Sequence, residues 1–84
     1  MKDVTLYSAN WCPFCLRAKG LLESREIPFK EINVDEIPGF REKLVEMTGR
    51  MTIPQIFIGD ESIGGWDDLS ALDRSGELAT LLAG

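Results

Sequence analysis

The two residues whose type and spacing could do chemistry are Cys12 and Cys15, the only cysteines of the chain, which stand in the sequence Cys-Pro-Phe-Cys. Two thiols three residues apart at a helix start are close enough to form a disulfide, and thiol–disulfide exchange is the chemistry of such a pair. A zinc site is a weaker interpretation, because the chain has no histidine and carboxylates rarely complete a structural zinc site. The spacing therefore favours redox chemistry over a metal site or over two cysteines that only fill the core, and we predict no metal.

The roles of the two thiols follow from their place at the predicted helix start. Cys12 has the position of a helix cap, and Pro13 suits the first helical position, where a missing N–H costs nothing. Unpaired backbone N–H groups and the helix dipole favour a thiolate at Cys12, and in such settings the pKa of a cysteine falls from ~8.5 to roughly 3.5–7.5. Arg17 and Lys19 could lower it further, although solvation explains Arg17 better. We expect Cys12 to attack and Cys15 to resolve the mixed disulfide.

The bulk properties fit one small domain. The chain has 84 residues, of which 44% are hydrophobic and 27% charged, so we expect residues 1–84 to form a single domain and a monomer. Its net charge of −5 disfavours nucleic acids and anionic membranes as partners, because both require clustered lysine and arginine. The first residues lead directly into a short alternating run without the apolar stretch of a secretory signal, so we expect a cytoplasmic protein with no membrane contact.

The elements that must position the cysteines are predicted from periodicity and from glycine and proline. Alternating β-branched and aromatic residues predict strands, and apolar residues at helical spacing predict helices. Strands are predicted at residues 3–7, 29–34, 55–58 and 61–63, and helices at 13–25, 38–49 and from 67 to the end, the last one divided near Ser75-Gly76. The second helix is predicted to bury Phe40, Leu44, Val45 and Met47. Because a helix connects the first two strands, they should be parallel.

This β-α-β-α-β-β-α order, with the reactive helix directly after the first strand, is that of the thioredoxin fold. That fold is an α/β domain whose four-stranded mixed sheet is flanked by three or four helices. Over essentially its full length the chain resembles the small dithiol glutaredoxins of bacteria. The resemblance lies in Val4-Thr5-Leu6-Tyr7, Cys12-Pro13-Phe14-Cys15, Thr52-Ile53-Pro54-Gln55-Ile56-Phe57-Ile58-Gly59 and Ile63-Gly64-Gly65-Trp66-Asp67-Asp68-Leu69. One Cys-x-x-Cys is a moderate signal, but these motifs in this order and spacing are a specific one.

The resemblance implies a cis peptide bond between Ile53 and Pro54, in a segment that includes Thr52 and faces the cysteines. The backbone N–H and C=O of Ile53 would then be free to pair with the backbone of a cysteinyl peptide, as in the addition of a strand to a sheet edge. From the residues alone, Pro54 could instead simply begin an edge strand.

The resemblance also implies a glutathione site at the start of the last helix. Backbone N–H groups near Trp66 and Asp67 would bind the γ-glutamyl carboxylate, and the Asp67 carboxylate would accept the amino group. Asp67 also fits a plain helix cap, a role that Asp68 could share.

A cation is expected for the glycyl carboxylate of glutathione. Arg41 matches the family's position for this contact, Arg50 is a weaker candidate, and either could be a solvated surface charge. Beside the sulfur, Trp11 and Phe14 would form ring walls of the glutathione site. The chain departs from the family pattern at Ala9, where a lysine is common, and at Trp11 and Trp66, whose bulk would narrow substrate choice or shield apolar surface.

Taken together, the resemblance implies a glutathione-dependent thiol–disulfide oxidoreductase, with glutathione as reducing co-substrate and no bound cofactor. It would reduce protein–glutathione mixed disulfides through Cys12 and protein disulfides, those of ribonucleotide reductase among the candidates, through Cys12 and Cys15. Three alternatives stay open: a thioredoxin-like or ribonucleotide-reductase electron donor reduced by a flavoenzyme, a dimer that binds an iron–sulfur cluster through Cys12 and glutathione, and a pure interaction module.

Overall fold

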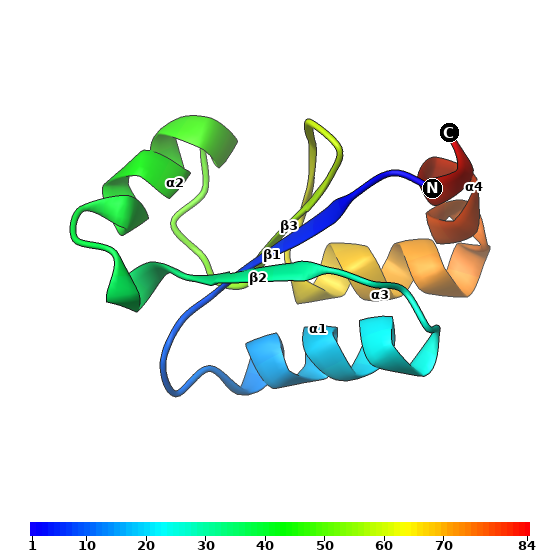
Figure 1. Ribbon diagram of the computed structural model, residues 1–84, viewed down its shortest axis with the longest axis horizontal. Helices are drawn as coiled ribbons and strands as arrows, with labels where there is room; N and C mark the ends of the chain where they lie inside the picture. Colours follow the sequence, from blue (N-terminus) through cyan, green and yellow to red (C-terminus); the bar gives the residue numbers. More distant parts are fainter.

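The computed structural model describes residues 1–84 and contains one sheet with helices on both faces (Figure 1). The strands are β1 (Val4–Ser8), β2 (Lys30–Asn33), β3 (Gln55–Ile58) and β4 (Glu61–Gly64), and the helices are α1 (Pro13–Ser24), α2 (Phe40–Thr48), α3 (Trp66–Ser75) and α4 (Glu77–Ala83), with a short 3₁₀ helix, η1, at Val34–Glu36. This is the predicted thioredoxin fold, with four α-helices.

The sheet has the strand order β2-β1-β3-β4. Strand β1 runs parallel to β2, as predicted for strands connected by a helix, and antiparallel to β3. Strands β3 and β4 form the predicted hairpin. Because β1 lies in the middle of the sheet, the loop that follows it carries the cysteines to the centre of one end of the molecule.

The main core lies on the sheet face covered by α1, α3 and α4. Strand residues of one parity point to this face, and the ten buried residues of the cluster are Val4, Leu6, Ala18, Leu22, Ile27, Ile56, Ile58, Leu69, Leu78 and Leu82. Helices α1 and α3 pack side by side there (Figure 1). Buried leucines, Leu22 of α1 and Leu69 of α3, therefore anchor both of these helices to the sheet.

A smaller core on the opposite face holds α2. Tyr7, Val34 and Leu44 are its buried members, and the Tyr7 ring stacks on Phe40 at 5.6 Å and meets Phe57 edge-on at 5.5 Å between ring centroids. This aromatic contact ties α2, β1 and β3 together.

The structure corrects three details of the sequence prediction. Met47, predicted to be buried, is exposed because α2 turns only a narrow stripe around Leu44 toward the sheet. Helix α2 begins two residues later than predicted, after Gly39 with φ +75°. Strand β2 ends at Asn33 because the Asn33 side chain accepts the Asp35 N–H and starts η1.

The other boundaries lie within two residues of the prediction. The last helix divides as predicted, because Gly76, at φ +84°, separates α3 from α4. The two chain ends lie close together, away from the start of α1 (Figure 1), and Lys2 N–H donates to the Leu82 carbonyl. No helix combines the length and the apolar character that crossing a membrane demands.

Candidate active site

Cys12 is the N-cap of α1, as its sequence position predicted. Its backbone is extended (φ −114°, ψ 97°), Pro13 occupies the first helical turn, and Cys12 Sγ accepts the Cys15 N–H at 3.2 Å. Proline fits because its φ is helical and its position needs no N–H donor. The sulfur therefore lies where a backbone N–H of the first helical turn and the positive end of α1 favour negative charge.

The two cysteines form a disulfide, with their Cα atoms 5.2 Å apart. Cys12 is half-buried, whereas Cys15 is only 2% exposed and lies on the buried face of α1. A partner molecule can therefore reach the Cys12 sulfur, and Cys15 lies one helical turn deeper. This asymmetry agrees with the predicted division between an attacking and a resolving thiol.

The segment before β3 supplies the wall opposite the sulfur. The Ile53–Pro54 peptide bond is cis, as the resemblance implied, and the Ile53 carbonyl oxygen lies 3.8 Å from Cys12 Sγ. The Gln55 amide group, fully buried, donates to both the carbonyl and the hydroxyl oxygen of Thr52. Gln55 thus fixes the Thr52 backbone and side chain beside the cysteines, while its own Oε1 has no partner in the chain.

The start of α3 supplies the third wall. Gly65 is the N-cap, and the carboxylate of Asp68 accepts the Gly65 N–H at 2.9 Å and an ion-pair contact from Arg50 at 2.9 Å. The pKa of Asp68 is held below its usual value, mainly by the hydrogen bond from the Gly65 N–H and further by Arg50. The two contacts connect the N-terminus of α3 with the loop after α2.

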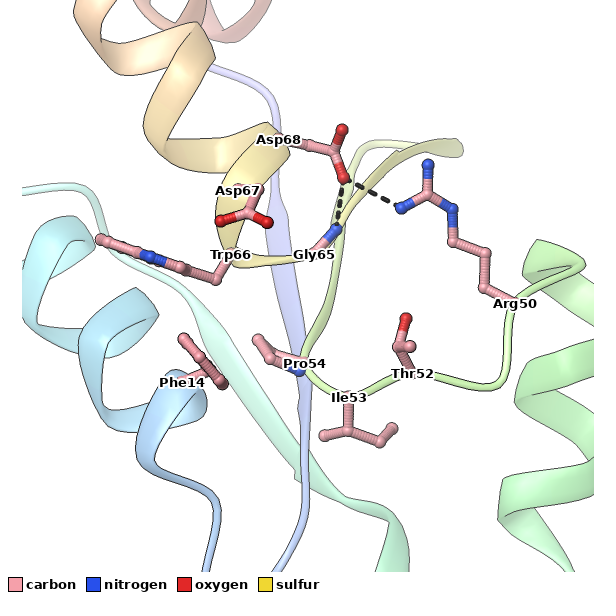
Figure 2. A pocket seen from close by; sticks show the side chains of 9 residues that line it. All are labelled: Phe14, Arg50, Thr52, Ile53, Pro54, Gly65, Trp66, Asp67 and Asp68. Carbon is pink, nitrogen blue, oxygen red and sulfur yellow. Dashed lines mark hydrogen bonds and ion pairs between the residues drawn. The ribbon is translucent and has the colours of Figure 1, made fainter.

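The start of α1, the segment before β3 and the start of α3 enclose an open groove of about 350 Å³ (Figure 2). Its lining residues come from α1, from the cis-proline segment and from the start of α3: Phe14, Arg50, Thr52, Ile53, Pro54, Gly65, Trp66, Asp67 and Asp68. Phe14 and the indole of Trp66 stand at one end and Arg50 at the other (Figure 2). The groove therefore runs past Pro54 toward Asp67, with aromatic rings at one end and the Arg50–Asp68 ion pair at the other.

Asp67 and Asp68 have different situations although they are neighbours. Asp68 caps the helix, whereas Asp67 is exposed on the groove and makes no hydrogen bond or ion pair within the chain. The alternative in which Asp67 only caps α3 is therefore wrong, because Asp68 fills that role. Asp67 keeps its carboxylate free for a ligand.

Two predicted site residues lie outside the groove. Arg41 pairs with Asp35 at 2.9 Å and lines a neighbouring hollow of about 230 Å³, with Arg50, Thr52 and Ile53 at their border. The structure thus brings Arg50 rather than Arg41 to the groove. Trp11 is 99% exposed and does not line the groove, so it forms no wall of it.

Gly65, Asp68 and Gln55 are site residues that the sequence prediction gave no role in binding. The sequence analysis named Asp68 as a possible sharer of the helix cap, and the structure shows that its side chain makes the cap contact. Nothing in the local sequence around Gln55 signals its contact with Thr52, because that contact depends on the turn at Pro54.

The arrangement combines an accessible sulfur, positively polarised N–H groups at two helix starts and a groove with one free carboxylate and one guanidinium. It can bind a short peptide that carries two carboxylates and an amino group. If that peptide contains a disulfide-bonded cysteine, Cys12 can form a mixed disulfide with it by thiol–disulfide exchange.

Comparisons with known proteins identify the family of the chain. The glutaredoxin family model matches residues 4–63. The chain is 46% identical to a glutaredoxin of Pseudomonas aeruginosa over 83 residues, covering 99% of each chain. It is also 46% identical to glutaredoxin 3 of Escherichia coli K12 over 82 residues, which is 98% of this chain and 99% of the relative.

Solved structures give the same result. A crystal structure of a buckwheat glutaredoxin–glutathione complex superposes with a TM-score of 0.91 at 28% identity, covering 98% of this chain and 77% of the other. The solution structure of a Brucella melitensis glutaredoxin superposes with a TM-score of 0.86 at 46% identity, covering 98% and 89%. The chain therefore belongs to the glutaredoxin family and is a glutathione-dependent thiol–disulfide oxidoreductase.

Proposed function

We propose that this glutaredoxin removes glutathione from protein–glutathione mixed disulfides, with Cys12 as the nucleophile. The Cys12 thiolate bonds to the glutathione sulfur, the bond between that sulfur and the protein breaks, and the protein leaves as a thiolate that takes a proton from water. A second glutathione thiolate then attacks the glutathionyl sulfur on Cys12. This step releases oxidised glutathione and restores the Cys12 thiolate.

The observation that carries the proposal is the position of Cys12 Sγ. The sulfur accepts a helix N–H at the start of α1 and lies 3.8 Å from the carbonyl of Ile53, a residue of the groove wall. Charge stabilisation and a binding groove therefore meet at one half-exposed atom, which is what a nucleophile needs in order to receive a glutathionyl group.

Glutathione fits the groove by charge. Its γ-glutamyl carboxylate matches the N-terminus of α3 at Trp66 and Asp67, and its amino group matches the free Asp67 carboxylate. We assign the glycyl carboxylate to Arg50, because Arg50 lines the groove and Arg41 does not. Its cysteinyl backbone would pair with Ile53. The buckwheat relative, solved as a glutathione complex, supports glutathione as the ligand.

For protein disulfides we propose the dithiol route. Cys12 attacks one sulfur of the substrate, and Cys15 then displaces the substrate by closing the internal disulfide that the structure contains. Glutathione reduces this disulfide in turn. Cytoplasmic proteins with exchangeable thiols, ribonucleotide reductase among them, are the proposed partners of a monomer that works there without a bound cofactor.

Paired serine variants test the assignment of roles. C12S should lose all exchange activity, whereas C15S should keep the deglutathionylation of a small mixed disulfide, because that reaction needs one thiol. Steady-state kinetics at varied glutathione should give a ping-pong pattern for the wild type and for C15S. Retained activity in C12S would refute the nucleophile assignment.

The choice of reductant separates this function from its closest alternative. The oxidised protein should be reduced by glutathione and not by a thioredoxin-reducing flavoenzyme supplied with NADPH. The reverse preference would identify an electron donor of the thioredoxin type. A coloured, dimeric purified protein would instead point to the cluster-binding alternative.

A further inference from the structure

Gln55 is a buried polar residue next to the groove. It is the first residue of β3 and lies opposite Tyr7 of β1. Its side chain is fully buried and does not line the groove, so a ligand does not touch it. Thr52, three residues earlier, is exposed and does line the groove. Any effect of Gln55 on a ligand must therefore act through a neighbour, and Thr52 is the neighbour to which its side chain donates hydrogen bonds.

The orientation of the Gln55 amide follows from its two partners. A carbonyl oxygen can only accept a hydrogen bond, so the amide atom that lies 3.0 Å from the Thr52 carbonyl oxygen must be the nitrogen. The same nitrogen lies 3.1 Å from the Thr52 hydroxyl oxygen. An amide nitrogen carries two hydrogens, and each of them has an acceptor here. One buried group thus holds both the backbone and the side chain of a groove residue.

These contacts also decide what the Thr52 hydroxyl can do. A hydroxyl can donate one hydrogen bond and accept others. Because its oxygen accepts from Gln55, its proton is left for a different acceptor. Figure 2 shows the Thr52 side chain between Pro54 and Arg50, with its oxygen on the side where Asp68 lies. The hydroxyl is therefore a hydrogen-bond donor available to a ligand in the groove.

The placement of Gln55 leaves one buried atom unpaired. Its Oε1 has no hydrogen-bond partner in the chain, and an unpaired buried acceptor destabilises a folded protein. A methionine side chain would fill a similar volume without such an atom. Packing alone therefore does not explain an amide at this position, and an unpaired buried polar group calls for a specific explanation. The two hydrogen bonds to Thr52 provide one.

We propose that Gln55 is a positioning residue for deglutathionylation, because its amide holds Thr52 so that the Thr52 hydroxyl donates a hydrogen bond to glutathione in the groove. The inference rests on the proposed function, since glutathione is the ligand. Thr52 and Arg50 border both the groove and the neighbouring hollow. The acceptor on glutathione therefore lies at the Arg50 end of the groove.

Two mixed disulfides of one peptide test this proposal, one with glutathione and one with cysteamine, which has no peptide groups to bind. The parent protein is C15S, in which Cys12 is the only thiol. Both Q55M and T52V should lower kcat/KM about fivefold for the glutathionylated peptide, the loss expected for one hydrogen bond, and leave kcat/KM for the cysteamine peptide unchanged. T52S, which keeps the hydroxyl, should behave like the parent. Q55M and T52V combined should cost less than the product of the single effects, because both remove the same hydrogen bond.

I58V is the control for lost stability. It shortens another buried residue of β3, which belongs to the main core, and it should keep the parent's preference for the glutathionylated peptide. An equal loss of preference in I58V would reduce the effect of Gln55 to general destabilisation and overturn the inference.

The remaining outcomes separate this inference from the function on which it rests. If the parent does not deglutathionylate the peptide, the proposed function fails. If the parent does and T52V keeps its full preference, only the inference fails, and this result stands even where Q55M does not fold, because Thr52 is exposed. Single effects that multiply fully in the combined variant would mean that Gln55 does not act through the Thr52 hydroxyl.

Discussion

Two neighbouring aspartates have different roles: Asp68 stabilises the start of a helix, and Asp67 is available to bind a ligand. Asp68 faces back over the start of α3 and satisfies the Gly65 N–H, while Asp67, one position earlier, points its carboxylate to the groove without a partner in the chain (Figure 2). A helix places adjacent residues about 100° apart, so one of the two carboxylates can cap the helix while the other stays available to a ligand.

We therefore predict opposite effects for the two amide variants. D68N should lower the free energy of unfolding by about 1 kcal/mol, because it weakens the cap and the contact with Arg50. D67N should leave the free energy of unfolding unchanged and raise KM for glutathione several-fold, because it removes the partner of the amino group. Urea denaturation and steady-state kinetics on both proteins measure the two effects.

Each variant serves as the control of the other, since both lose one negative charge from the same turn. Equal loss of stability in both variants would mean that the cap is shared. An unchanged KM in D67N would remove Asp67 from the glutathione site.

At the scale of elements, the junction between β4 and α3 positions half of the groove. Gly64 ends β4 at φ +105°, and a Cβ atom there would lie 2.6 Å from Asp68 Cγ and 3.0 Å from a guanidinium nitrogen of Arg50. Only glycine lets the backbone turn here while Asp68 and Arg50 meet above it.

The variant G64A should therefore lower the free energy of unfolding by roughly 1–3 kcal/mol, through backbone strain and displacement of the Asp68 carboxylate. It should also raise KM for glutathione, because Arg50 loses its anchor. Thermal unfolding followed by circular dichroism, together with kinetics, measures both.

Gly20 provides a matched control within α1. A Cβ atom at Gly20 meets nothing within 4 Å, and alanine is favoured over glycine inside a helix by up to about 1 kcal/mol. G20A should thus stabilise the protein. If G64A proved as stable as G20A, the close approach of a Cβ atom at residue 64 to Asp68 and Arg50 would not affect the free energy of unfolding.

At the scale of the whole molecule, four ion pairs connect different elements of the fold. Lys19–Glu31 joins α1 to β2, Arg25–Asp73 joins the end of α1 to α3, Arg41–Asp35 joins α2 to η1, and Arg50–Asp68 joins the loop after α2 to α3. Each carboxyl has a lowered pKa, caused mainly by hydrogen bonds from Ser8 for Glu31, Arg25 for Asp73, Arg41 for Asp35 and the Gly65 N–H for Asp68.

These shifts predict that acid destabilises the fold. A carboxyl whose pKa is lower in the folded than in the unfolded state stabilises the fold above its unfolded pKa of about 4, and that contribution disappears as pH falls through the folded pKa. The urea midpoint should be constant from pH 7 to about 5 and fall below about pH 4. In D73N the fall should be shallower, and a midpoint that stays constant to pH 3 would contradict the prediction.

Much of this molecule follows from local sequence. The order of elements, the division of the last helix at Gly76, the cap at Cys12 and the buried stripe of α1 are set by short-range preferences: proline at a helix start, glycine at positive φ and leucine at helical spacing. The cis bond before Pro54 and the groove toward Asp67 followed from the motifs and not from periodicity.

What the local sequence could not give is which distant side chains meet. Arg41 and Arg50 are exposed arginines at opposite ends of α2. Only the packing of α2, through Leu44, against Tyr7 and Val34 turns Arg41 toward Asp35 and leaves Arg50 with Asp68 at the groove. Met47 likewise has the right spacing to be buried but lies beyond the reach of the small core.

The sequence by itself thus determined the reactive chemistry, because a thiol at a helix N-terminus needs only its immediate neighbours to become a nucleophile. The tertiary structure decided the ligand groove, because the groove depends on three segments that the sheet brings together from positions up to 50 or so residues apart. Local energies select each turn, but only the packed cores on both faces of the sheet determine which turns lie side by side.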